Sequence, residues 1–590
     1  MTVSDRPQAA LRSQDGPRVG GTLRLRGPAP VHRLDPSASH QAPADQVIRL
    51  FARQLFGYAP APDLRDWRAI APAPDLATDV PSTYNTGMGA RHTNYVVHLR
   101  RGVFWDTEPA REVTAHDVVR GLKRLANPLT RPAALPYFTS TIRGMAQYCE
   151  DYAAAIRRDD PTAEELAAFQ NSHDIPGVLV LDDESLVIEL VRPAIDFAAI
   201  MALPCASPAP VEYDAFLPGS PELHRNLRSN GPYRPVRLVP GRELRLEPNP
   251  VWRQESDPLR HRYLDGIEVA VEDAAPEHVA ARVASGAADL PWGVRVAEPH
   301  GAEPADPGDG LGLSLDPYLV FNLRSPAAGG ALADVRVRRA LSYAIDKAAI
   351  ADLYRRSGRG ALVRTAGSVV PPGNDAHQEL DLYATPGSRG DASRCRALLA
   401  EAGHGSGLAL TAVHLDTGLD AAVARSYASD LEKAGVAVRL VALDHDARDA
   451  LLGDPRRAAA GEWDVAAAAW SPDWYPANGR VFLQPMFQSS DSRNSANRGR
   501  YRRPEVDSLI ERALATIEEP ARSTAAWNEA ERTVLEDAAV VPVLFQRPAV
   551  PGLRGPRVRG AVPMPALGHA YDLAGVWLDP PDDPPDDPAE

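Results

Sequence analysis

The chain of 590 residues is too long for a single hydrophobic core, so its length predicts two to four folding units. Hydrophobic residues make up 44% of the sequence and charged residues 24%, which is ordinary for a globular protein. The formal net charge of −14 disfavours a general nucleic-acid binder and a protein held on an anionic membrane surface, since both need a basic field. No stretch approaches the roughly 18 consecutive apolar residues of a transmembrane helix.

In chain order, the first half of the sequence predicts short strands, turns and a few helices. Residues 20–27 alternate apolar and polar side chains and predict a first strand, and the apolar spacing within 45–56 predicts a helix. Thr114 is a suitable N-cap for a helix over the residues that follow it. Two apolar runs within 177–190 are split by Asp-Asp-Glu-Ser, which predicts a hairpin.

The second half alternates helices with strands, the pattern of an α/β domain. Residues 333–354 predict the clearest helix, and residues 393–403 predict another that ends at Gly403. The other expected elements are a strand over 462–470, two helices over 503–538 and a strand over 540–548.

The sequence carries no catalytic or cofactor motif that we recognise. It has no Walker A loop, no His-Glu-x-x-His pair and no Gly-x-Ser-x-Gly elbow. Its 15 histidines lack ligand spacing, and its three cysteines form no Cys-x-x-Cys clamp, so we expect free thiols and no metal site. A triad that assembles only in the fold stays open. We therefore expect a protein that is not an enzyme and has no cofactor.

One stretch, AAAAWSPDWYPANG over 466–479, places a single acid among aromatic side chains. The small alanines predict a buried strand, and the residues that follow a strand of an α/β sheet commonly line a binding site. A carboxylate in a dry pocket is costly unless a cation accompanies it. Asp473 therefore either anchors a ligand amine or serves the fold by capping a helix or pairing with an arginine. The local sequence leaves both alternatives open.

Several segments occur together in a recognisable order. They include YVVHLRRGVFWDTEPAREVTAHDVVRGLKRLANP (95–128), SNGPYRPVRLVPGRELRLEPNPVW (229–252), ADVRVRRALSYAIDKAAI (333–350) and EWDVAAAAWSPDWYPANG (462–479). In this order the chain resembles the family 5 extracellular solute-binding proteins of ABC transporters, the oligopeptide-, dipeptide- and nickel-binding class. The resemblance extends over roughly residues 20–577.

The resemblance implies an α/β fold of two lobes, the class II fold of periplasmic binding proteins, with an extra subdomain inserted in lobe I and an interlobe ligand cleft. Two chain crossings between the lobes would act as hinges. The implied parts are a disordered N-terminus at 1–17, lobe I at 18–60, 185–278 and 542–578, the inserted subdomain at 61–184, lobe II at 279–541, and a disordered acidic tail at 579–590.

The resemblance also implies a ligand site. In peptide-binding members the acid of the Trp-x-x-Asp stretch holds the ligand's ammonium, and Asp473 stands at that position. Trp470 and Trp474 would wall the pocket and add about 0.5–2 kcal/mol of cation–π attraction. The remaining candidates are Ser471, His40 and Gln41 for backbone contacts, and Tyr318 and Asn322, for which core packing is the alternative.

The implied partners are a peptide or peptide-like small molecule and the membrane permease of an ABC importer, bound by a monomer without nucleic acid. Ala467 and Ala469 stand where oligopeptide binders often carry arginine and glycine, so dipeptides, sugars and metal chelates stay open as ligands. No apolar run or lipobox cysteine precedes the first strand. The family implies an extracytoplasmic place. The second hypothesis is a cytoplasmic member of the fold that acts as a ligand sensor, carrier or biosynthetic accessory protein.

Overall fold

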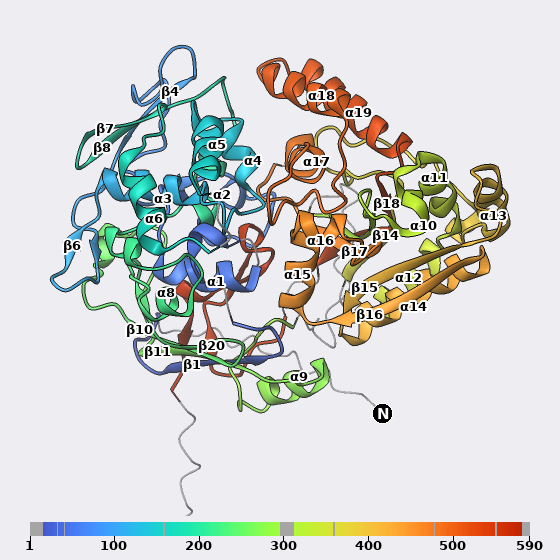
Figure 1. Ribbon diagram of the computed structural model, residues 1–590. Coiled ribbons are helices and arrows are strands. Elements are labelled where there is room, and N and C mark those ends of the chain that lie inside the picture. Colours follow the sequence, from blue (N-terminus) through green and yellow to red (C-terminus); the bar gives the residue numbers. More distant parts are fainter. Residues whose placement is uncertain are drawn as a thin grey trace, which may run out of the picture.

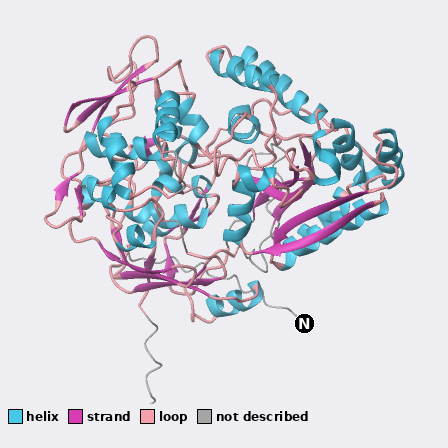
Figure 2. Ribbon diagram, in the orientation of Figure 1, coloured by secondary structure: helices cyan, strands magenta, loops and turns pink. Residues whose placement is uncertain are grey.

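Two mixed β-sheets divide the chain into two lobes, and a mainly helical subdomain lies above lobe I in the view of Figures 1 and 2. The structure is a computed structural model that describes residues 16–31, 34–39, 42–156, 160–294, 312–357, 360–476, 478–548 and 552–580. The expected disordered termini fall almost wholly outside these residues. None of the helices within them is long and apolar enough to span a membrane.

Lobe I is built on a five-stranded sheet in the order β12-β1-β11-β10-β9. Strand β1 pairs in parallel with both β11 and β12, and its alternating Leu23 and Leu25 are fully buried in the core of this lobe. Its strands are β1 (Thr22–Gly27), β9 (Tyr233–Val239), β10 (Glu243–Pro248), β11 (Gly266–Val271), β12 (Leu290–Pro291), β20 (Val558–Arg559), β21 (Val562–Met564), β22 (Ala570–Asp572) and β23 (Trp577–Leu578). Its helices are α1 (Ala42–Phe51), α8 (Pro221–Arg225) and α9 (Pro276–Ala284).

The inserted subdomain combines a small sheet, ordered β4-β8-β7, with helices. Thr114 caps α3 as expected, in a capping box in which its backbone N–H donates to Asp117 at 2.9 Å. The strands are β2 (Phe56–Gly57), β3 (Ala73–Pro74), β4 (Asn94–His98), β5 (Phe104–Trp105), β6 (Arg111–Glu112), β7 (Val178–Asp182) and β8 (Ser185–Glu189). The helices are α2 (Trp67–Ile70), α3 (Ala115–Leu125), α4 (Leu135–Thr139), α5 (Met145–Ala155), α6 (Ala163–Ser172) and α7 (Phe197–Ile200).

Lobe II contains the larger sheet, in the order β14-β19-β13-β17-β15-β16, with β18 also paired to β13. Helices cover this sheet (Figure 1). The strands are β13 (Ser314–Phe321), β14 (Gly360–Thr365), β15 (Leu408–Leu415), β16 (Val436–Leu443), β17 (Val465–Trp470), β18 (Val540–Pro542) and β19 (Leu544–Pro548). The helices are α10 (Ala327–Gly330), α11 (Val335–Ala344), α12 (Lys347–Ser357), α13 (Ala392–Glu401), α14 (Gly418–Lys433), α15 (His445–Gly453), α16 (Pro455–Ala459), α17 (Gly479–Phe487), α18 (Pro504–Ala515) and α19 (Pro520–Glu536).

Strand pairing moves three of the expected domain boundaries. Strand β12 pairs with β1, so lobe I continues to residue 291 instead of ending at 278. Strand β19 pairs with β13 and β14, so lobe II continues to residue 548 instead of 541. Strand β8 pairs with β4 and β7, so the boundary expected at 184 falls inside a hairpin of the inserted subdomain. In each case a partner distant in sequence or a tight hairpin decides the membership of a short strand.

Local expectations hold for most elements. The hairpin at 177–190, the strand ending at Trp470, the helix ending before Gly403 and the three free, buried cysteines are confirmed. The single helix expected over 333–354 is wrong, because the structure has α11 and α12 there. Ile345 adopts an extended backbone, and the Asp346 carboxylate accepts from Ala349 N at 2.8 Å, which starts the second helix.

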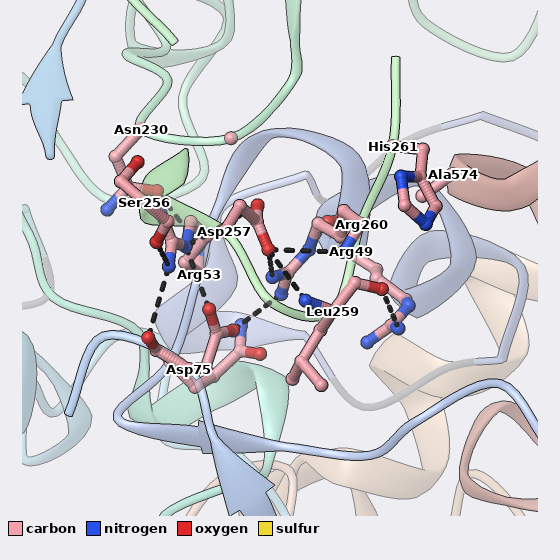
Figure 3. A network of polar contacts seen from close by, with 12 residues as sticks. Arg49, Arg53, Asp75, Asn230, Ser256, Asp257, Leu259, Arg260, His261 and Ala574 are labelled. Atoms are coloured by element: carbon pink, nitrogen blue, oxygen red, sulfur yellow. Dashed lines mark hydrogen bonds and ion pairs between the residues drawn. The ribbon is translucent and has the colours of Figure 1, made fainter. Parts of the chain in front are cut away.

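A buried network of charges joins lobe I to the start of the inserted subdomain (Figure 3). Asp75 accepts from Arg53 Nε at 2.8 Å and from Arg260 Nη2 at 2.7 Å, and all three side chains are fully buried. The lobe I charge network consists of three cations (Arg49, Arg53 and Arg260) and three carboxylates (Asp75, Asp257 and Asp572). Every cation has a carboxylate partner, so the charges of the network balance within the fold.

Candidate functional site

The loop that carries Asp473 begins at the carboxyl end of β17. This strand lies between β13, its antiparallel neighbour, and β15, its parallel neighbour. From β15 the chain passes through α14 to β16 on one side, and it returns through α15 and α16 to β17 on the other. The strand order therefore reverses between β15 and β17, and in open α/β sheets ligands bind in the crevice outside the carboxyl ends at such a point.

The Asp473 carboxylate meets the inserted subdomain. Tyr137, on α4, donates from its hydroxyl to Asp473 Oδ2 at 2.6 Å. Burial raises the pKa of Tyr137 well above its ordinary value, and the charge of Asp473 adds to the effect. Burial also raises the pKa of the Cys205 thiol, with smaller contributions from Asp45 of α1 and from Asp473. The carboxylate thus lies where lobe I, the inserted subdomain and lobe II come together.

The two tryptophans beside Asp473 pack this junction. The Trp474 indole contacts the Tyr137 ring edge-on, with 4.8 Å between ring centroids. The Trp470 indole N–H donates to the Val481 carbonyl of α17 at 2.6 Å. The protein therefore already occupies the polar atom of Trp470, and both indoles are almost fully buried.

The smaller candidates from lobe II lie on β17 and its neighbour β13. Ser471 is exposed, and its hydroxyl shares a 2.8 Å hydrogen bond with the Ser314 hydroxyl at the start of β13. Tyr318, farther along β13, pairs with Ala468 of β17 and is buried. These contacts join the start of the Asp473 loop to β13.

The remaining candidates do not join this group. Asn322 is fully buried, and its side-chain amide donates to the Ala458 and Trp463 carbonyls, both at 2.8 Å. Both amide protons are thus used to hold lobe II together, so we correct the expected ligand role of Asn322 to core packing. His40 and Gln41 lie outside the residues that the structure describes.

A buried ion pair across the lobes is the main feature that sequence reasoning missed. Arg480 of α17 reaches into the inserted subdomain and donates to Asp196 Oδ1 at 2.7 Å and to Thr141 Oγ1 at 2.7 Å. Its side chain is 2% exposed and that of Asp196 5%. Helix α17 is buried along its whole length, so a single charged residue on a largely apolar helix was the available signal.

Two further polar pairs lie between the same two parts of the molecule, closer to the surface. Arg192 pairs with Glu511 of α18 at 2.7 Å, and His92 lies 2.8 Å from the Glu518 carboxylate. These pairs are partly exposed and weaker than the Arg480 pair, because solvent screens them. Together the contacts hold the inserted subdomain and the segment around Asp196 against α17 and α18 of lobe II.

The chain matches a known family along most of its length. The family described as "Bacterial extracellular solute-binding proteins, family 5 Middle" matches residues 71–494, so the chain belongs to these solute-binding proteins. The periplasmic oligopeptide-binding protein OppA of Escherichia coli (strain K12) is 26% identical over 465 residues, 76% of either chain. Heme-binding protein A of Haemophilus influenzae is 26% identical, over 82% of this chain and 81% of its own.

Solved structures confirm the expected two-lobed α/β fold. The structure of clavulanic acid biosynthesis oligopeptide binding protein 2 is 27% identical, with a TM-score of 0.70 over 95% of this chain and 96% of that one. The murein tripeptide binding protein MppA of Escherichia coli is 20% identical, with a TM-score of 0.72 over 95% of this chain and 98% of its own.

Proposed function

We propose that this chain is the solute-binding component of an ABC importer. It captures a peptide or peptide-like small molecule outside the cytoplasm as a monomer, closes its lobes around the ligand and delivers it to a membrane permease. The observation that carries the proposal is the hydrogen bond from Tyr137 to Asp473, because it puts a carboxylate of lobe II against the inserted subdomain. Relatives named for oligopeptides and for a murein tripeptide support a ligand of this kind.

An ammonium group suits the surroundings of Asp473. A charge-assisted hydrogen bond is stronger in a junction that excludes water than on an exposed surface. The Tyr137 hydroxyl donates to one carboxylate oxygen, and this bond would fix the orientation of the carboxylate toward a ligand amine. Binding of this kind is reversible and involves no covalent step.

The permease would recognise the protein in its closed, ligand-bound form. Arg480 of lobe II is paired with Asp196 at the inserted subdomain, so an opening that separated these two parts would return both charges to water. A ligand that bridges the lobes favours the closed state by its difference in affinity for the two states.

The test is isothermal titration calorimetry with a panel of dipeptides to pentapeptides. Asp473→Asn keeps the shape of the side chain and removes its charge, so we expect affinity for an amine-bearing ligand to fall by about 2–5 kcal/mol. Asp375→Asn, at an exposed site in lobe II, is the matched control and should bind as the native protein does. Equal affinities for native protein and Asp473→Asn would remove Asp473 from the site.

A second candidate is a role beside a biosynthetic pathway, as a ligand carrier or sensor. The 27% identity to a binding protein named for clavulanic acid biosynthesis favours it. Both candidates require reversible binding, so location separates them. Protease accessibility of the native protein on intact cells supports the importer component, and a protected, cytoplasmic protein supports the carrier or sensor.

A further inference from the structure

A groove of about 380 Å³ lies between the end of α5 and one face of α6, two helices of the inserted subdomain (Figure 1). Ala155 and Ile156, at the end of α5, form one apolar wall. The other lining residues stand at positions 165, 168, 169, 172 and 173, along α6 and its C-cap. Residues three and four apart share one face of a helix, so these side chains lie along a single stripe.

A stack of three nearly parallel rings runs from the core of the subdomain to this groove. The Tyr152 ring stacks on Phe169, with 4.4 Å between centroids and 10° between planes. Phe169 in turn stacks on the His173 imidazole, with 4.1 Å between centroids and again 10°. Tyr152 and Phe169 are buried, whereas His173 is exposed and lines the groove. The stack therefore ends in a ring that offers an aromatic surface to a further planar group.

The hydrogen-bonding groups beside this ring are arranged as acceptors. His173 Nδ1 lies 3.1 Å from the Phe169 carbonyl oxygen, which can only accept a hydrogen bond. In the neutral imidazole Nδ1 therefore carries the proton, and Nε2 is left as an acceptor. The Ser172 hydroxyl donates its one proton to the Ala168 carbonyl at 2.6 Å, so its oxygen can only accept from a ligand.

The charge of the groove also favours a cation. Glu165 places a carboxylate on it, and this carboxylate accepts from Thr162 N at 2.7 Å in the capping box of α6. A carboxylate has about four lone-pair directions, so capping leaves it able to accept from a further donor. Neither arginine nor lysine is among the described residues that line the groove. The groove therefore suits a planar group that is positively charged and donates hydrogen bonds.

We propose that this groove docks an arginine side chain that a partner protein presents. A guanidinium is planar and always charged, and it carries several N–H donors. It can therefore stack on the His173 ring and donate to the Glu165 carboxylate at the same time. The methylene stem of the arginine would pack against Ala155 and Ile156. A lysine ammonium is a compact point charge without a planar surface, so it would fit less well.

The exposure of the groove favours a protein as the partner. Glu165, Ala168, Ser172 and His173 are all exposed, so solvent reaches the groove along α6. Sites for small molecules enclose roughly 70–90% of the ligand's surface, which an open groove does not do. A side chain held by another folded protein needs no such enclosure. The inference goes beyond the proposed function, because the groove contains none of the residues around Asp473.

The test uses N-acetyl-arginine methylamide, which carries a guanidinium but neither a free ammonium nor a carboxylate. An NMR titration that observes the probe should give a dissociation constant of about 0.1–10 mM, as expected for one side chain. His173→Ala and Glu165→Gln should each weaken binding at least about threefold. Glu164→Gln, also exposed and next in sequence, is the matched control and should bind as the native protein does. N-acetyl-lysine methylamide should bind at least about threefold more weakly.

Two results would overturn the docking site. One is equal affinity of native protein for the arginine and lysine probes. The other is unchanged binding of the arginine probe by His173→Ala or Glu165→Gln. If His173→Ala does not fold, Ala168→Leu takes its place with the same expected loss, because it fills the exposed groove.

Further arms separate a partner protein from other occupants of the groove. Free arginine should bind no more tightly than the blocked probe, because no basic lining residue meets its carboxylate. Free arginine that bound about 100-fold more tightly would mark a small-molecule site and contradict docking of a protein. Tighter probe binding by the double variant Arg157→Gln/Arg158→Gln than by native protein would show that the chain's own arginines compete for the groove, which would also contradict it. All these arms are read without a peptide ligand, so failure of the proposed function leaves them unchanged.

Discussion

Two groups of arginines, one in each lobe, differ in burial and in how their charge is balanced. The arginines of the lobe I charge network are buried, whereas Arg448 and Arg498 of lobe II are partly exposed. In the lobe I charge network each arginine meets a carboxylate, as Arg53 and Arg260 both meet Asp75. In lobe II, Arg448 and Arg498 meet no carboxylate in the described part of the chain. The first group is balanced by carboxylates within the fold, whereas solvent reaches the second group. A fully buried arginine therefore has carboxylate partners within the fold, whereas partial exposure lets water stabilise an arginine that has none.

The largest loss of stability should follow from disrupting the lobe I charge network. Asp75→Asn leaves Arg53 and Arg260 buried beside a neutral amide, so we expect the free energy of unfolding to fall by about 3–5 kcal/mol. Urea denaturation measures it. Asp79→Asn, exposed and close in sequence, is the control and should change stability little. A loss below about 1 kcal/mol would mean that the network contributes little to stability.

Acid should weaken the same network. Burial opposes ionisation of Asp75, but Arg260 and Arg53 outweigh burial and hold the pKa of Asp75 below its ordinary value. A carboxyl group whose pKa is depressed in the folded state stabilises the protein above its unfolded pKa of about 4, and this contribution is lost as the pH falls further. Unfolding free energies from pH 6 to pH 3 should therefore decline more steeply in native protein than in Asp75→Asn. Parallel slopes would contradict the assignment.

Disrupting the Arg480–Asp196 ion pair should lower stability less than disrupting the lobe I charge network. Arg480→Gln leaves Asp196 without its partner, yet opening of the lobes would return that carboxylate to water. We therefore expect only about 1 kcal/mol of lost stability. The open state should gain population, seen as a larger radius of gyration by small-angle X-ray scattering and as ligand dissociation at least about tenfold faster, about 1.4 kcal/mol. A compact variant with unchanged dissociation would show that the pair does not control closure.

The unbalanced group should give the smallest change in stability, and of opposite sign. Arg498→Gln removes one of two like charges that lack a carboxylate partner, so ligand-free protein should gain up to about 1 kcal/mol of unfolding free energy. Urea denaturation without peptide measures it, with Arg425→Gln as control. A loss comparable to that of Asp75→Asn would show that Arg498 serves the fold, as its counterparts in lobe I do.

Much of the fold follows from local sequence, and the exceptions have a common cause. The strand at Trp470, the hairpin at 177–190 and the cap at Thr114 each depend on residues near in sequence. The domain boundaries depended on β12 and β19, whose membership is set by partners far away along the chain. Asp346 divided a continuous apolar pattern into two helices, because a side chain that can cap a helix competes with its continuation.

In the candidate site, too, the sequence indicates features that depend on neighbouring residues and misses contacts between distant ones. Asp473 could be chosen as a candidate from the sequence because an acid among aromatic residues is anomalous within a few positions. Its partner Tyr137 lies 336 residues away, and Arg480 and Asp196 are 284 residues apart, so neither contact leaves a local signature. Arg448 and Arg498 are ordinary in sequence. Only the lack of a carboxylate partner in the described structure distinguishes them.

The central claim is that Asp473 holds the ammonium of a peptide-like ligand. Titration calorimetry with short peptides, each with a free and with an acetylated N-terminus, tests it most directly. We expect acetylation to weaken binding to native protein by at least about 30-fold, about 2 kcal/mol. Asp473→Asn should bind both forms equally weakly. Equal affinity of native protein for the free and acetylated peptides, or no binding by any peptide, would contradict the claim.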